Sequence, residues 1–157
     1  MKSFLLAIAV AVPAFLTVAP TTHADQPGKH PAFLHALSDL RAARGNLQRR
    51  GGDAQDKWDE SKAIGAIDAA IGKIKAASID DGKNLNDHPA VDPSKPRPGL
   101  MHDALSLLQA AHRDVDQEED NAFAQGLKHR ALEDIDAAIL RTKEGLCNAG
   151  DKSFCPH

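Results

Sequence analysis

The sequence contains no tyrosine and only one tryptophan among its 157 residues. Proteins that bind single-stranded nucleic acid stack the bases on aromatic side chains along a basic groove. This chain has 19 Lys and Arg against 22 Asp and Glu, and the basic residues are scattered among the acidic ones. It therefore lacks both parts of such a site, and we expect no nucleic-acid partner.

Motifs of the common enzyme and cofactor classes are also missing. The chain has no nucleophile-elbow serine, no phosphate-binding glycine loop, no zinc-protease motif and no Cys-x-x-Cys-His motif for haem attachment. The acidic run 114–121 fails as a calcium-binding EF-hand, because Glu119 stands where that loop needs glycine. These absences predict a protein that is not an enzyme and has no cofactor.

The longest apolar run lies at the N-terminus. Lys2 precedes an alanine-rich stretch, 4–12, which is too short for a good membrane span. Thr22 and Ala24 then supply small residues at the first and third positions before a cleavage site, as is typical of a secretory signal. We expect residues 1–24 to be a signal peptide, with an uncleaved membrane anchor as the alternative. Residues 25–157 would then form one periplasmic or secreted domain without a membrane span.

The two cysteines, Cys147 and Cys155, lie close together near the C-terminus. Export places them in a compartment where thiols oxidise, so we expect a disulfide that pins the tail to the last helix. For so short a loop the entropic stabilisation is about 2–3 kcal/mol. The alternative is a thiolate metal site that also uses His157.

The chain repeats itself at one constant shift, which takes residue 36 to residue 104. Residues 36–43 and 104–111 are identical at six of eight positions, and residues 63–71 and 131–139 at six of nine. Because a single ungapped shift serves both segments, we interpret the chain as a duplicated helical hairpin.

Apolar residues recur at helical spacing in both copies. The expected inward positions include Phe33, Leu37, Leu40, Leu47, Ile64, Ile67, Ile71, Ile74, Met101, Leu105, Leu108, Val115, Leu132, Ile135, Ile139, Thr142 and Leu146. The segment 83–98 contains four prolines, so it is predicted to be an extended linker. Since the connections inside each copy are shorter, we predict an all-α protein: an antiparallel four-helix bundle from hairpins at about 31–82 and 99–147.

The ends of the first and third helices differ in charge. The first ends in Arg49 and Arg50, and the third in the acidic residues 118–120. If the duplicated helices end on the same side of the bundle, these groups can pair across it. We therefore expect the two ends to lie together.

Histidines on the predicted helices are the candidate metal ligands. Three of them are followed four residues later by a carboxylate, which places both groups on one helical face, either as metal ligands or as local ion pairs. These pairs are His35 with Asp39, His112 with Asp116, and His129 with Glu133. A tight site needs a ligand from another helix, so the candidate divalent-metal set combines His35, Asp39, His102 and His112.

Asp68 and Asp136 occupy the same place in the two copies, each within Ile-Asp-Ala-Ala-Ile. They either face one another as a paired-carboxylate site or bond separately to basic groups at the edge of the core. An enzymatic role would require the first arrangement, buried in a pocket.

Three strings, 30–41 (HPAFLHALSDLR), 79–89 (IDDGKNLNDHP) and 118–121 (EEDN), resemble those of small exported bacterial helical proteins of unknown function. The resemblance implies the helical fold and carries over no catalytic or binding residue. We therefore expect a non-enzymatic bundle with a binding or structural role in the periplasm or cell envelope, through a protein partner or self-association. The alternative is a divalent-metal-binding or metal-buffering protein.

Overall fold

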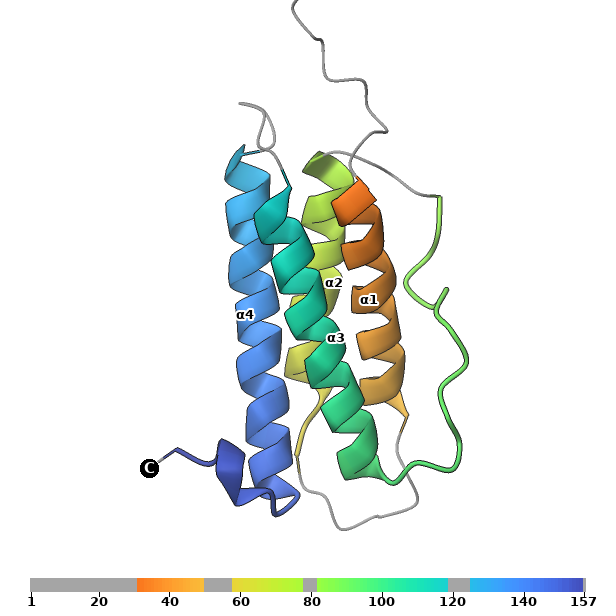
Figure 1. The fold of residues 1–157 in the computed structure, drawn as a ribbon, viewed down its shortest axis with the longest axis vertical. Helices are drawn as coiled ribbons and strands as arrows, with labels where there is room; N and C mark the ends of the chain where they lie inside the picture. Colours follow the sequence, from red (N-terminus) through yellow and green to blue (C-terminus); the bar gives the residue numbers. More distant parts are fainter. Residues whose placement is uncertain (1–30, 50–57, 78–81, 119–124, 157) are drawn as a thin grey trace, which may run out of the picture.

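A computed structural model describes residues 31–49, 58–77, 82–118 and 125–156. Its elements are α1 (Pro31–Gln48), α2 (Ser61–Ala77), α3 (Arg97–Gln117), α4 (Gln125–Asn148) and a short 3-10 turn, η1 (Lys152–Phe154). The described ranges contain no strand, and the helices form a four-helix bundle (Figure 1), which confirms the predicted fold class. The expected signal peptide, 1–24, lies outside the described residues. No described helix has the length and apolar character needed to cross a membrane.

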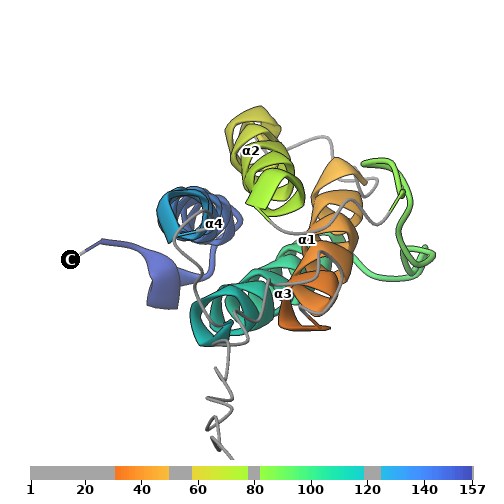
Figure 2. The same cartoon turned by 90° about the horizontal axis from the view of Figure 1, so that it is seen from above.

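The two hairpins pack mainly against each other. The most extensive contacts join α1 to α3 and α2 to α4, followed by α3 with α4, whereas α1 and α2 touch less. Around the bundle the order is α1, α3, α4, α2 (Figure 2). Helices α1 and α4 run in one direction and α2 and α3 in the other (Figure 1), so neighbouring helices are antiparallel. Each hairpin therefore supplies the apolar surface that the other covers.

The core is built from equivalent positions of the two copies. In α1, Phe33, Leu37, Leu40 and Leu47 are buried, and the repeat shift takes them to Met101, Leu105, Leu108 and Val115, which α3 also buries. Full burial of a side chain of this size stabilises the fold by about 1.5–3 kcal/mol. The inward positions expected from periodicity are confirmed, although Ile64, Leu132 and Ile139 lie half-buried at the edge of the core. This correspondence supports the interpretation of a repeat, which stays a prediction.

Helix α3 begins within the segment that was predicted to be linker. Its first residue is Arg97, preceded by Pro96 in an extended conformation (φ −67°, ψ 158°). The sequence prediction was wrong for Arg97 and Pro98, because the first turn of a helix leaves its N–H groups without helical partners and so tolerates proline. Gly82, the first described residue after α2, has φ +70°, a left-handed conformation that favours glycine.

The expected meeting of the first and third helix ends does not occur. Because α1 and α3 are antiparallel, Arg49 and Glu118 lie at opposite ends of the bundle (Figure 1). Instead, Lys128 at the start of α4 donates hydrogen bonds to the carbonyl oxygens of Asp116 (2.9 Å) and Glu118 (2.7 Å). A lysine placed there stabilises carbonyl groups that the end of a helix leaves unbonded. Arg50, Glu119 and Asp120 lie outside the described residues.

A buried ion pair joins the starts of α2 and α3. Nη2 of Arg97 donates to Oε2 of Glu60 at 3.1 Å, and both side chains are at most one-tenth exposed. The Arg97 guanidinium also lies over the Trp58 ring, 5.8 Å from its centroid. On α4, Gly145 lets this ring approach the helix closely, since a Cβ atom there would lie 2.7 Å from the indole. The cluster thereby ties three helices together at one end of the bundle.

Candidate functional site

The connection between the hairpins is fastened to the bundle at several points. Residues 82–96, hereafter the strap, run along the outer side of α1 (Figures 1 and 2). Arg41 of α1 is buried, and its Nε and Nη2 donate to the carbonyl oxygens of Asn84 (3.0 Å) and Lys83 (3.4 Å). Lys75 of α2 donates to the same Lys83 carbonyl at 2.8 Å. The buried Arg41 cation is thus hydrogen-bonded to backbone carbonyls of the strap, as a charged group inside a protein requires.

Farther along the strap, the ring of His88 sits over a notch in α1. The notch is Gly45, where a Cβ atom would lie 2.7 Å from the imidazole. Nδ1 of His88 lies 2.7 Å from the carbonyl oxygen of Pro89, so this nitrogen carries the proton and donates it. Glycine at this position therefore makes room for the His88 ring, and the backbone conformation of α1 does not demand it.

Gly45→Ala tests the notch. The methyl group is expected to push His88 off α1, while alanine in place of glycine stabilises the helix itself by about 1 kcal/mol. The strap should then loosen without unfolding the bundle, seen as shifted His88 ring signals and faster amide exchange at residues 83–90. Gly72→Ala is the matched control, because nothing lies within 4 Å of its Cβ position. Unchanged His88 signals in Gly45→Ala would contradict the notch.

Beyond His88, the strap, α1 and α3 line an open groove of about 440 Å³. Its apolar lining is Ala42, Leu107, Pro89 and Ala90. Its polar lining is Asn46 from α1, Asp103 and Ser106 from α3, and Asp92 from the strap. A hollow of this volume is in the range that proteins use for binding.

The polar groups of the groove retain capacity to bind. Oδ1 of Asp92 accepts from the backbone N (2.8 Å) and Oγ (2.7 Å) of Ser94, and these hydrogen bonds hold the pKa of Asp92 below its ordinary value. Oδ2 of Asp103 pairs with Lys95 at 2.5 Å, a bond that raises the pKa of the lysine. Within the described part of the chain, the second oxygen of each carboxylate and the side chains of Asn46 and Ser106 have no hydrogen-bond partner.

The structure does not bring the four candidate metal ligands together. His102 of α3 lies 3.1 Å from Oδ2 of Asp151 and packs edge-on against Phe154, while His112 lies 3.4 Å from Oδ1 of Asp136. Among residues 31–49, 58–77, 82–118 and 125–156, no group of three or more His, Cys, Asp or Glu side chains is arranged to hold a metal ion.

The helix-spaced histidine pairs have different outcomes. His129 and Glu133 form the expected exposed pair at 3.2 Å. His112 instead pairs with Asp136 across to α4 and not with Asp116 of its own helix. At the α1 pair, burial and the nearby Asp114 raise the pKa of Asp39, against the opposing effects of His35 and Arg113.

Asp68 and Asp136 bond to different basic groups. Asp68 accepts from Nε of Arg44 at 2.6 Å, and Asp136 is largely exposed beside His112. Each carboxylate thus bonds to a basic group on the other helix of its own hairpin. The repeat shift takes Arg44 to His112 as well as Asp68 to Asp136, so the two pairs are equivalent positions of the two copies.

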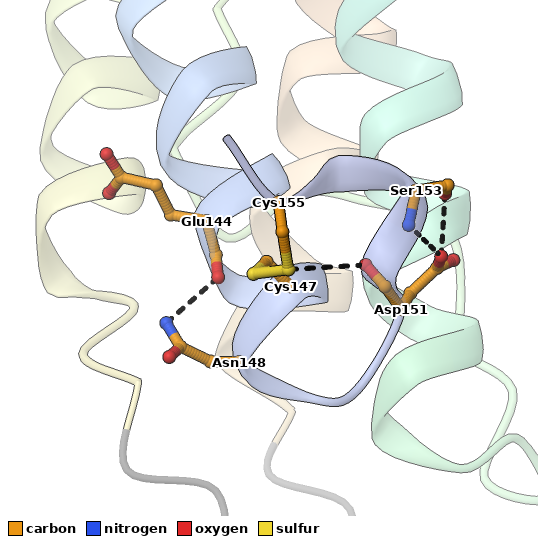
Figure 3. Close-up of a disulfide and its surroundings, with 6 residues drawn as sticks. All are labelled: Glu144, Cys147, Asn148, Asp151, Ser153 and Cys155. Carbon is orange, nitrogen blue, oxygen red and sulfur yellow. Dashed lines mark hydrogen bonds between the residues drawn. A yellow bond between two sulfur atoms is a disulfide. The ribbon is translucent and has the colours of Figure 1, made fainter. Parts of the chain in front are cut away.

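The C-terminal tail is joined to α4 by a disulfide. Cys147 and Cys155 are bonded, with their Cα atoms 5.0 Å apart, as expected from the sequence (Figure 3). Asp151 caps η1 by accepting from Oγ (2.6 Å) and N (3.1 Å) of Ser153, and these hydrogen bonds lower its pKa. His157, the third ligand of the alternative metal site, lies outside the described residues.

Reducing this disulfide should loosen the tail and leave the bundle folded. The bond closes a short loop, so its loss removes about 2–3 kcal/mol of loop-entropy stabilisation, and it acts on the tail alone. We expect amide protection at residues 150–156 to disappear while helical circular dichroism stays nearly constant. A large fall in helical signal on reduction would show that the bundle itself depends on the disulfide.

The chain matches no protein-family model, and no curated protein or solved structure is similar to it at a significant level. What the groove can bind therefore depends on its own lining residues. Sequence reasoning missed it, because the strap was expected only to run over the surface. One signal was present: Arg41 falls between buried positions on the inner side of its helix, where a cation needs a fixed acceptor.

Proposed function

We propose that this protein is exported, is not an enzyme, and acts by binding a partner protein at the groove between the strap, α1 and α3. The observation that carries the proposal is the set of polar side chains that meet in this groove with unused hydrogen-bonding capacity. Arg41 holds the start of the strap at Lys83 and Asn84, and the His88 ring rests against α1 at Gly45, so the chain is anchored just before the residues that form the groove wall. Preorganised walls reduce the conformational entropy that binding costs.

A non-enzymatic role is supported by what lines the groove. Its two carboxylates, Asp92 and Asp103, each already accept structural hydrogen bonds. The lining contains no histidine, cysteine or lysine to work with them as an acid, base or nucleophile. Export is supported by the secretory pattern of residues 1–24 and by the bonded pair of cysteines, which suits an oxidising compartment.

Site-specific photo-crosslinking in the producing cell tests this proposal. A photoreactive residue at Ser106, on the exposed rim of the groove, is expected to give an adduct of discrete mass. The same residue at Ala69, exposed on α2 away from the groove, is the control and should give none. An adduct of twice the chain mass would identify self-association, and absence of any adduct from Ser106 would contradict partner binding. If residues 1–24 are a cleaved signal peptide, the exported chain should begin at Asp25.

A further inference from the structure

We infer that the groove receives a positively charged side chain, a guanidinium or an ammonium group, presented by the partner protein. This inference rests on the proposed function and names the chemistry of the group that is recognised. The lining contains two carboxylates and no basic side chain. Bonds between an ionised acceptor and a cationic N–H donor are about twice as strong as neutral ones, so a cation gains most from this lining.

The free acceptors come from two sides of the groove. Oδ1 of Asp92 is used by Ser94 and Oδ2 of Asp103 by Lys95, which leaves Oδ2 of the first and Oδ1 of the second. Asn46 and Ser106 add an amide and a hydroxyl oxygen. Asp92 is exposed and, like any solvated aspartate, is ionised at neutral pH, and the hydrogen bonds from Ser94 lower its pKa further. A guanidinium or ammonium group has several N–H donors, so it can use more than one of these acceptors.

The apolar lining suits the stem of such a side chain. Ala42, Leu107, Pro89 and Ala90 offer carbon surface in the same groove as the acceptors. Arginine and lysine bury their methylene groups along apolar surface while the charged head reaches polar partners. The groove has a volume of about 440 Å³, which leaves room for the side chain of an arginine or a lysine.

Two cations of the chain itself stand next to the groove without lining it. Lys95 pairs with Asp103 and also lies near enough to Asp92 to interact with its charge, as does Arg49. The side chains of Lys95 and Asp103 are 43% and 39% exposed, so their pair contributes little to stability and can be exchanged. Lys95 is thus a competitor for the incoming cation, and removing its charge should tighten binding.

The test is a nuclear magnetic resonance titration of the mature, exported chain with the peptide acetyl-Ala-Arg-Ala-amide. The matched probe replaces arginine by citrulline, which keeps the shape and removes the charge. We expect the arginine peptide to shift the amide signals of Asn46, Asp103 and Ser106, and to bind at least about threefold more tightly than the citrulline peptide. Raising the salt concentration should reduce this difference.

Variants of the carboxylates and of Lys95 should change the affinity for the arginine peptide in opposite directions. Asp92→Asn and Asp103→Asn should each weaken binding of the arginine peptide by at least about threefold, and Lys95→Gln should strengthen it. Asp87→Asn is the control, because Asp87 is an exposed strap carboxylate outside the lining. Melting curves of all four variants check that the bundle is intact.

Equal binding of the two peptides, or a Lys95→Gln variant that binds no more tightly, would overturn the inference. If agmatine, a free guanidine, binds more tightly than the peptide, the partner protein is the wrong source of the cation. Crosslinking at Ser106 that is unaffected by Asp92→Asn and Asp103→Asn would overturn the charge inference and leave the proposed function standing. If the photoreactive residue at position 106 gives no adduct even with Asp92 and Asp103 unchanged, both the charge inference and the proposed function are contradicted.

Discussion

Replacing Glu60 by alanine is expected to lower the free energy of unfolding by about 3–5 kcal/mol, because it leaves a buried guanidinium without its carboxylate. Arg97 is held between Glu60 and the Trp58 ring, and neither charged side chain reaches much solvent. Urea denaturation followed by circular dichroism measures the effect. Such a loss is a large fraction of the stability of a small domain, typically about 5–15 kcal/mol.

The control for this variant is Glu144→Ala. Glu144 pairs with Arg141 at 2.9 Å on the surface of α4, with both side chains 42% exposed. Exposed pairs of this kind contribute up to about 1 kcal/mol, since water solvates each partner when the other is removed. Equal losses in the two variants would show that burial does not set the cost. In the double variant Glu60→Leu with Arg97→Met, much of the lost stability should return, since no charge is left buried.

Ile71→Asp is expected to unfold the domain or to cost more than about 4 kcal/mol. The Ile71 side chain is 1% exposed in the seam of α2 and offers a carboxylate neither water nor a hydrogen-bond donor. Ala69→Asp places the same group on the exposed side of the same helix and should cost less than about 1 kcal/mol, mainly through helix propensity. Thermal melts of the two variants give the comparison. An unchanged melt for Ile71→Asp would mean that this helix faces the other way.

What could be predicted from the sequence is what depends on near neighbours in the chain. The period of three and four residues places Leu37, Leu40 and Ile71 in the core, because a helix brings such positions to one side. The cysteine pair could be predicted because Cys147 and Cys155 lie close together in the chain. His129 finds its partner Glu133 one turn away on its own helix.

What could not be predicted depends on which helices meet and in which direction. His112 has an acidic residue one turn away, yet it pairs with Asp136 because α4 approaches that side of α3. The direction of α3 relative to α1 also decides that Arg49 and Glu118 lie apart. The candidate groove needs residues from α1, α3 and the strap, and Arg41 finds its acceptor 43 positions along the chain. A periodic pattern contains no information on such distant pairs.

The packing of the hairpins has a consequence for how the chain folds. Since α1 buries its apolar side chiefly on α3, and α2 on α4, a single hairpin leaves Leu37, Leu40 and Ile71 without most of their cover. Neither hairpin is therefore expected to persist alone. The chain must first close the long loop through the strap, an entropic cost that precedes the stabilising contacts. Because each hairpin needs the other, the bundle should fold in one cooperative step. Helical proteins with mainly local contacts fold fastest, so this bundle should fold more slowly than one in which helices that follow each other in the chain make most of the contacts.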